Sequence, residues 1–473
     1  MTIESVIWHE PRSEDMDIVW IIIDGLSYSA TPFSEDGPDT LPRIKQLADD
    51  HGVVFSNAYA PGPLSPSSHA SMFTGQLPSA VGMHEARPYF DSDAPTIATA
   101  LRDSHQTHLV TGNEWLFQGL DEDFDEKFDF GRQYLIYRDA LDPGPYFHGD
   151  NSRVRDFVKD SIEEGGFVKS VANAVNYKFN GGYGVMPKDW GDSEEYQYAK
   201  AQTEEVRKRL KTDGDNCVVA NYMDVHAPIK ATDEAIEKFS ESGGSDKLPV
   251  KVSPERHIPD SEKSYDVDRM GQLYKAAIWD VDKKISPLIE ELLEDDVFVV
   301  LTSDHGRIDT GTAYSDTRLH VPLVIFSPDE EARTVSETVS IRSIPKTITD
   351  AVNVNTVNFD GISLLDVEQD QTAITEIIHH PNEVYHETHR VDITRVPGKD
   401  DRDIQHDVVI HEGKARGEYI DEEFSTTNAS SEQEKSFRDI CERLRKRTVK
   451  GTQEDELDTD PVTEERLEDL GYI

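Results

Sequence analysis

Residues 17–25 read DIVWIIIDG, and this stretch decides the predicted fold. Residues 18–23 are all apolar, a pattern typical of a strand that is buried on both faces, as in a parallel sheet. The chain is then expected to turn at Asp24 and Gly25. Similar strand patterns recur at residues 52–60, 107–112, 216–223, 297–303 and 321–327.

Helical patterns lie between these strands, and the longest covers residues 265–296. Strands that alternate with helices predict an α/β fold, in which a central, mostly parallel sheet is flanked by helices. The Pro- and Ser-rich stretch 61–68 is expected to form an elbow before a helix that starts near His69.

The pattern changes after residues 359–366. Short strand-like runs at 383–388, 406–413 and 415–420 precede two predicted terminal helices. We therefore expect a catalytic domain at residues 1–355 and a smaller α+β subdomain at residues 356–473. Residues 231–263 are polar and rich in Pro, Gly and Ser, so we expect a surface insertion there.

The chain is strongly acidic, with 48 Lys and Arg against 93 Asp and Glu and a formal net charge of −45. The acidic residues are spread along the chain. Such a field repels nucleic acid and anionic membranes, which excludes both as expected partners. It suits a halophilic protein in a high-salt cytoplasm, where screening weakens self-repulsion. The alternative is an ordinary acidic mesophilic protein.

The sequence lacks the signals of membrane insertion and export. No apolar run approaches the roughly 18 residues of a membrane span. The first residues lack a basic segment followed by an apolar one, so we expect no signal peptide. Two cysteines are too few for a disulfide framework. We therefore expect a cytoplasmic protein.

Side chains suited to chemistry follow several of the predicted strands. Because the carboxyl ends of parallel strands share one edge of a sheet, the residues at these ends should form a single site. They are Asp24, Asp224, His226, Asp304 and His305, with Ser65 in the elbow before a helix. Taken singly, each could instead be a turn or helix-cap residue.

Five segments resemble the sulfatase family of the alkaline phosphatase superfamily, and they occur in the family's order. They are IIIDG (21–25), SPSSHASMFTGQLPS (65–79), MDVHAP (223–228), VVLTSDHG (299–306) and EERLEDLGYI (464–473). Thr74-Gly75 sets the register that places Ser65 at the nucleophile position. The resemblance implies an alkaline-phosphatase-like fold and hydrolysis of sulfate or phosphate esters.

The resemblance also implies a division of roles. Asp24, Ser65, Asp304 and His305 would bind one divalent cation. Ester hydrolysis needs a nucleophile, a cation on the ester oxygens and a proton for the leaving group. Ser65 would be the nucleophile. Oxygens with one imidazole suit manganese or zinc, whereas the family often uses calcium.

Other residues are expected to line the same site. His226 would orient the anion or act as the acid, and His69 would donate to Ser65 or to a substrate oxygen. Asn113 would line the substrate pocket. The segment after Gly306 lacks the usual anion-binding Lys or His, so Arg318 and His320 are candidate substitutes, as is Arg307. A second metal set of Asp224, His226 and His320 is a lesser alternative.

The sequence departs from sulfatases at the nucleophile. Residues 65–69 read SPSSH, without the Pro at the third position and the Arg at the fifth that accompany conversion to formylglycine. Ser65 is therefore expected to stay an unmodified hydroxyl. The expected substrate is a small-molecule or glycan ester. The alternatives are a phosphodiesterase, phosphotransferase or mutase of the superfamily, or a non-catalytic binder of sulfated or phosphorylated glycans.

Overall fold

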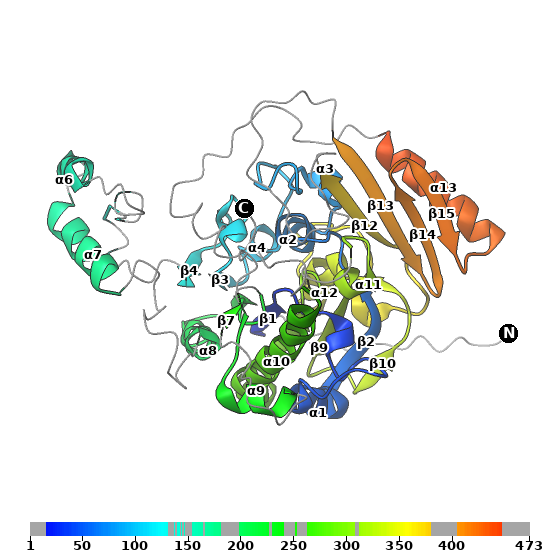
Figure 1. Cartoon of the computed structure of the whole chain (residues 1–473), viewed down its shortest axis with the longest axis horizontal. Coiled ribbons are helices and arrows are strands. Elements are labelled where there is room, and N and C mark those ends of the chain that lie inside the picture. Colours follow the sequence, from blue (N-terminus) through cyan, green and yellow to red (C-terminus); the bar gives the residue numbers. More distant parts are fainter. Residues whose placement is uncertain are drawn as a thin grey trace.

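A computed structural model gives the fold of the chain (Figure 1). It describes residues 16–130, 137, 140–141, 143, 146, 154–163, 166–180, 198–226, 229–240, 251–252, 263–307, 312–379 and 404–446. The predicted strand at 383–388 and the second terminal helix lie outside the described residues.

The core of the fold is a nine-stranded, mostly parallel sheet. Its order is β10-β2-β9-β8-β1-β5-β3-β4, and β11 pairs with β2. These strands are β1 (Ile18–Ile23), β2 (Gly52–Tyr59), β3 (Gln106–Thr111), β4 (Glu126–Asp129), β5 (Asn216–Tyr222), β8 (Phe298–Thr302), β9 (His320–Phe326), β10 (Arg333–Val335) and β11 (Val339–Ser340). Strand β9 alone runs antiparallel to its neighbours β2 and β8.

Helices cover both faces of this sheet, as the continuous apolar strands predict. Ile18, Trp20 and Ile22 of β1 pack in one core cluster with α2, α4 and α12. The alternate residues of β1 pack in a second cluster with α1, α8 and α10. The helices are α1 (Pro42–His51), α2 (Ser65–Thr74), α3 (Pro78–Val81), α4 (Ile97–Leu101), α6 (Val154–Glu163), α7 (Phe167–Asn180), α8 (Tyr198–Arg209), α9 (Asp233–Phe239), α10 (Lys263–Glu294), α11 (Asp316–Leu319), α12 (Ile344–Ala351) and α13 (Ser431–Arg445).

A smaller antiparallel sheet, β12-β13-β14-β15, forms the C-terminal part. It consists of β12 (Ala373–His379), β13 (Gln405–Glu412), β14 (Ala415–Ile420) and β15 (Glu423–Thr427). One face packs against α13 through Phe437 and Cys441. The other face packs against Tyr59, Tyr314 and Leu319 of the main domain. Figure 1 shows this sheet between α13 and the large sheet.

The predicted α/β fold is confirmed, with three local corrections. The elbow is shorter than expected, because α2 begins at Ser65 and not near His69. Pro66 explains this start, since proline lacks an N–H and is favoured in the first turn of a helix. The sequence patterns missed β12 and β15. Within 231–263, the expected surface insertion, α9 buries Ala235 and Ile236.

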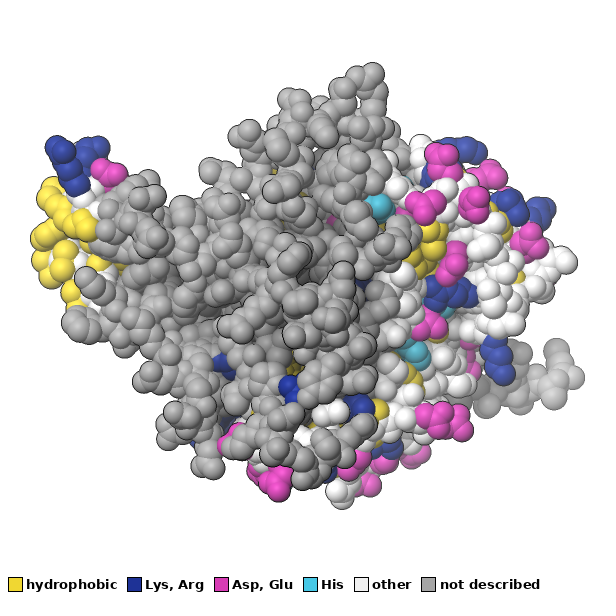
Figure 2. All heavy atoms as spheres, viewed as in Figure 1, with side chains coloured by type: hydrophobic (Ala, Val, Ile, Leu, Met, Phe, Trp, Pro, Cys, Tyr) yellow, Lys and Arg dark blue, Asp and Glu magenta, His cyan; other side chains and the backbone are white. Residues whose placement is uncertain are grey.

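Six of the eight large exposed apolar side chains of the described residues lie on α6 and α7, and the other two are Tyr137 and Ile362. The six are Val154, Val158 and Ile162 of α6, and Phe167, Val168 and Val175 of α7. Figure 2 shows them as an apolar group at one end of the molecule, whereas acidic and basic side chains intermingle elsewhere on the described face. The described part of the chain contains no helix long and apolar enough to cross a membrane.

Candidate active site

The carboxyl ends of two adjacent parallel strands bring the acidic residues together. In the pairing of β1 with β8, Ile22 lies opposite Thr302, so both strands end at the same level. Asp24 follows β1, and Asp304 follows β8. The backbone N–H of Gly25 donates to Asp304 Oδ1 at 3.1 Å. Gly25 has a φ of +74°, a backbone conformation that glycine adopts without the strain a side chain would bring.

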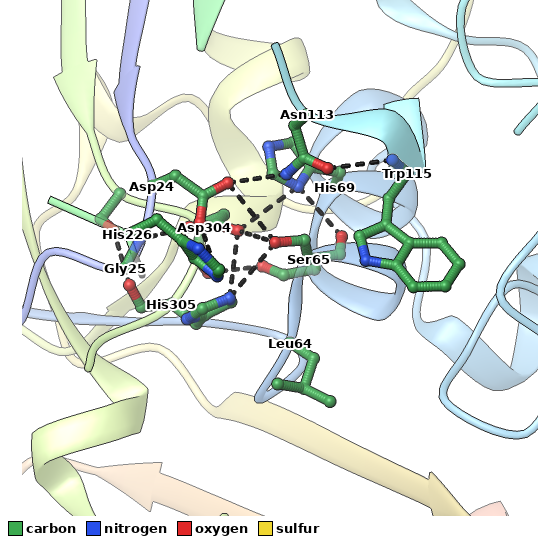
Figure 3. Close-up of polar contacts among 12 residues, drawn as sticks. Asp24, Gly25, Leu64, Ser65, His69, Asn113, Trp115, His226, Asp304 and His305 are labelled. Carbon is green, nitrogen blue, oxygen red and sulfur yellow. Dashed lines mark hydrogen bonds and ion pairs between the residues drawn. The ribbon is translucent and has the colours of Figure 1, made fainter. Parts of the chain in front are cut away.

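Ser65 lies at the first position of α2 and points at these groups (Figure 3). Its hydroxyl donates to Asp304 Oδ2 at 2.9 Å. Its Oγ lies 3.4 Å from Asp24 Oδ2 and 3.3 Å from His305 Nε2. The strand ends and the helix start thus bring the expected nucleophile within contact distance of three side chains of types that bind metals.

Asp24, Asp304 and His305 form a cluster that fits a divalent cation. One ligand atom from each lies within 4.8 Å of the others, and all three residues are buried. Among the described residues, Asp24 Oδ1 has no hydrogen-bond partner although it is buried. A buried carboxylate oxygen without a partner is costly, and a cation would satisfy it.

Electrostatics in the cluster also favour a cation. Burial and the nearby charge of Asp304 raise the pKa of Asp24 well above its usual value. Burial raises the pKa of Asp304 too, but the neighbouring His305 and His69 outweigh this effect and hold that pKa below its usual value. His305 Nδ1 donates to the Gly306 carbonyl at 2.7 Å. The hydrogen is therefore on Nδ1, and the lone pair of Nε2 faces the cluster.

Two asparagines hold Asp24 in place. The amide of Asn113 donates to Asp24 Oδ2 at 2.7 Å, and its oxygen accepts from the Trp115 N–H at 2.9 Å. The amide of Asn221, on β5, donates to the same carboxylate oxygen at 3.2 Å. Both polar ends of Asn113, expected to line the pocket, therefore have partners within the protein.

His69 contacts Ser65 from one helical turn further along α2. Its Nδ1 donates to the Ser65 carbonyl at 3.0 Å and lies 3.4 Å from Asp304 Oδ2. Its Nε2 accepts from the Asn221 amide at 3.2 Å. Burial lowers the pKa of His69, which favours the neutral ring. These contacts place His69 against the backbone of Ser65, and its catalytic role stays a prediction.

His226 borders the cluster, whereas Asp224 does not. His226 Nε2 lies 4.0 Å from Asp24 Oδ1, and Figure 3 shows its ring beside that carboxylate. Asp224 accepts from the Ala199 N–H at 3.1 Å and lies 3.8 Å from the Lys284 ammonium. The alternative second metal set is therefore not assembled through Asp224.

Arg318 and His320, two of the three candidate anion-binding residues after Gly306, differ in position. Arg318 is buried in α11, and its charge helps to lower the pKa of His305, after the larger effect of burial. His320 stacks between Tyr28 and Tyr59, with ring centroids 4.0 and 5.0 Å away. Its Nε2 lies 2.9 Å from the Ser56 carbonyl oxygen, and burial lowers its pKa to about 4. The contacts of His320 thus lie away from the metal-ligand cluster.

Sequence reasoning missed three supporting residues. The first is Asn221, which lies within the buried strand β5. A polar residue inside an otherwise apolar strand was the one feature of the sequence that could have pointed to it. Tyr274 of α10 donates to the Gly25 carbonyl at 2.7 Å and accepts from the Ser27 N–H at 2.9 Å. Ser303 donates to the His305 carbonyl at 2.5 Å. The contacts of Asn221 and Tyr274 join residues far apart in sequence, so they have no local signature, whereas the contact of Ser303 spans two residues.

The fold and the ligand cluster beside a buried hydroxyl define a member of the alkaline phosphatase-like superfamily. The chain belongs to the sulfatase family, whose model, named Sulfatase, matches residues 16–354. A phosphopentomutase from Alkaliphilus oremlandii is 31% identical over 103 residues, which are 22% of this chain and 26% of that protein. The match thus spans about a quarter of that relative.

Two solved structures share the fold at low sequence identity. The phosphonate monoester hydrolase of Agrobacterium radiobacter superimposes with a TM-score of 0.61 and 16% identity, covering 91% of this chain and 95% of that one. The protein BT4656, solved with its substrate D-glucosamine-2-N,6-O-disulfate, has a TM-score of 0.52 and 14% identity, covering 96% and 98%. At this level of identity, these two likenesses show the shared fold alone.

Proposed function

We propose that the chain is a metal-dependent hydrolase that attacks small-molecule or glycan phosphate or sulfate esters with the hydroxyl of Ser65. The observation that carries this proposal is the position of Ser65 Oγ. It lies between 2.9 and 3.4 Å from Asp24, Asp304 and His305, at the first residue of α2. A hydroxyl with only a turn-forming role would not need these three ligand-type partners.

We propose the following order of steps for the reaction. Ser65 Oγ would lose its proton along its hydrogen bond to Asp304 and form a bond to phosphorus or sulfur. The bond to the leaving alcohol would break, and His226 would donate the proton that the alcohol needs. Water would then attack the ester on Ser65, with its proton passing to His226. Asp304 would return its proton to Ser65 Oγ, so that the free hydroxyl and both groups are restored. Asn113, Asn221 and His69 would hold these groups in position.

Asp24, Asp304 and His305, with Ser65, would hold one divalent cation. A bound cation would stabilise negative charge on the ester oxygens and lower the pKa of the Ser65 hydroxyl. The donor set of two carboxylates and one imidazole favours manganese or zinc over calcium.

Within this class we favour phosphorus esters over sulfate esters. Formylglycine requires a motif that residues 65–69 lack, so the nucleophile is an unmodified serine. Phosphoserine can be hydrolysed, whereas sulfoserine cannot readily expel sulfate. The fold shared with a phosphonate monoester hydrolase is compatible with this choice.

A phosphotransferase or mutase is the second candidate. The similarity to a phosphopentomutase favours it, because a mutase moves a phosphoryl group between two hydroxyls of one substrate and does not release it to water. Free phosphate as the main product would support the hydrolase, and a phosphorylated acceptor alcohol would support the transferase.

The proposed function is tested with p-nitrophenyl phosphate, bis-p-nitrophenyl phosphate, p-nitrophenyl phenylphosphonate and p-nitrophenyl sulfate, in manganese and molar KCl. We expect a phosphorus ester to be the best substrate, and Ser65→Ala to lower its kcat/KM by about 10³-fold or more. Ser71→Ala is the matched control, since Ser71 lies on the same helix and its Oγ has no partner among the described residues. Wild-type activity in Ser65→Ala would refute the proposal.

We also propose that the protein works at high salt. The net charge of −45 supports this proposal. Acidic side chains also lie over several elements of the described surface and not on one tail (Figure 2).

A further inference from the structure

The one-turn helix α11 touches all three chain segments that carry the proposed metal and nucleophile residues. Three successive carbonyls at its end accept hydrogen bonds from these segments. The bonds are Ser27 Oγ to Thr317 O (2.7 Å), Gly306 N to Arg318 O (2.6 Å) and Ala60 N to Leu319 O (2.8 Å). Helix α11 is therefore a common support for the site.

Each of these contacts is close to a site residue in sequence. Ser27 comes three residues after Asp24, and Gly306 directly follows His305. Ala60 begins the short elbow that leads into α2. The approach at Gly306 is tight, because a Cβ atom added there would lie 2.0 Å from the Thr317 carbonyl oxygen. A shift of α11 would thus move the loops that carry the site.

A four-residue helix does not fix its own orientation, because a single turn is marginal without outside contacts. The C-terminal sheet supplies these contacts at the start of α11. The Arg416 guanidinium, on β14, donates to the Asp316 carboxylate and to the Tyr314 carbonyl. The Tyr314 hydroxyl donates to Asp407 Oδ2, on β13, at 2.7 Å.

These contacts differ in strength. The Asp316 side chain is 60% exposed, and an exposed ion pair alone contributes little. The bonds at Tyr314 are better protected, since Tyr314 and Asp407 are both buried. Arg416 is 20% exposed and makes the bonds to Asp316 and to the Tyr314 carbonyl from one planar group. It therefore fixes the direction of the chain at the start of α11 as well as its distance from β14.

We infer that the C-terminal sheet positions the site through α11, with Arg416 and Tyr314 as the positioning residues. Figure 1 shows the small sheet beside the part of the main domain that carries α11. The C-terminal sheet is then part of the catalytic apparatus, although none of its residues is assigned to touch the substrate. The inference rests on the proposed metal site for its functional meaning.

The test measures manganese affinity by calorimetry in Arg416→Ala and Tyr314→Phe. Loss of a residue that supports metal ligands typically weakens binding by about 10–100-fold, so we expect about 10-fold in Arg416→Ala and a smaller change in the same direction in Tyr314→Phe. Arg416→Lys, which keeps the charge but not the planar fork, should recover part of the loss. Arg438→Ala is the matched control, because Arg438 pairs with Glu434 on α13 and not with α11. Wild-type affinity in both variants would overturn the inference.

A second readout needs no metal. The Ala60 and Gly306 amides donate to α11, so their hydrogen exchange should speed up in metal-free Arg416→Ala and not in Arg438→Ala. If wild-type protein binds no manganese but this exchange rises, the proposed function fails and the positioning inference stands. Unchanged exchange at both amides would overturn the inference. If Arg416→Ala does not fold, Tyr314→Phe and Arg416→Lys carry both measurements.

Discussion

Asp24 and Asp304 are two buried carboxylates beside the same hydroxyl, that of Ser65, which donates to Asp304 Oδ2 at 2.9 Å and whose Oγ lies 3.4 Å from Asp24 Oδ2. The charge of Asp304 helps to raise the pKa of Asp24, which means that the two groups repel each other without a cation between them. This repulsion lowers the stability of the metal-free protein, and a bound cation would restore it. Its ligands should therefore be identifiable by thermal unfolding.

The first prediction concerns Asp304→Asn. Metal-free, the variant should unfold at or below the wild-type Tm, because the folded protein holds the pKa of Asp304 below its usual value and so favours its charged form. Manganese at a hundred times its Kd should stabilise the wild type by about 2.7 kcal/mol and should stabilise the variant far less. Asp224→Asn is the control, since Asp224 also follows a strand but binds the Ala199 N–H. A full manganese response in Asp304→Asn would count against the ligand assignment.

Sequence patterns predicted the residues at the strand ends but not their supports. Asp24 and Asp304 follow continuous apolar strands, and the geometry of a parallel sheet brings such positions together. Asn221 and Tyr274 reach the site through contacts that depend on how β5 and α10 pack. His320 was expected near the anion, yet its aromatic neighbours Tyr28 and Tyr59 hold it elsewhere, which no local pattern reveals.

At the scale of elements, α10 organises one face of the large sheet through two carboxylates. Asp280 accepts from both the N–H and the hydroxyl of Thr232, which caps α9. Asp282 accepts from the N–H groups of Arg43 and Ile44 at the start of α1, where the N-cap residue makes no side-chain bond. One long helix thus satisfies the free amides of two neighbours.

The second prediction is a pH dependence that originates at Asp282. Burial raises its pKa from 3.8 to about 6, so the folded state holds this proton more tightly than the unfolded state. The resulting stabilisation is present below about pH 4 and is lost as the pH rises through 6. Asp282→Asn should remove this fall, on the order of 2 kcal/mol in the wild type. Denaturant unfolding from pH 4 to 7 gives the free energy of unfolding of both proteins. The same pH dependence in wild type and Asp282→Asn would disprove the prediction.

The strand pattern predicted the central strands of the large sheet well because they are largely apolar, whereas the short edge strands β4 and β10 carry exposed residues and were not predicted. The C-terminal part was harder to predict. Strand β15 alternates exposed and half-buried residues, so it lacks a continuous apolar run. The direction of β9 was also invisible, since a buried apolar strand looks the same in either orientation. Its pairing with β2 and β8 decides the direction.

At the scale of the whole molecule, charge dominates. Each protein molecule carries a formal charge of −45, and compaction brings these charges together. Added salt shortens the screening length from about 10 Å at 0.1 M to about 3 Å at 1 M. The same charge argues against nucleic acid as a partner.

The third prediction follows from this screening. The Tm should rise as KCl increases from about 0.1 M to about 3 M, so that the protein unfolds cooperatively at low ionic strength and is stable in molar KCl. Circular dichroism melts in KCl measure this, with the uncharged osmolyte sucrose as the control for excluded-volume effects. A Tm that does not change with KCl would contradict the proposal of a high-salt protein.

The central claim is that an unmodified Ser65 forms the covalent intermediate. The most direct test is peptide mass spectrometry of enzyme quenched with acid during turnover of p-nitrophenyl phosphate. The account predicts that the tryptic peptide containing Ser65 gains the mass of one phosphoryl group, that this gain is absent in Ser65→Ala, and that the resting peptide has its unmodified mass. An aldehyde at position 65, or a phosphoryl group on another residue, would contradict it.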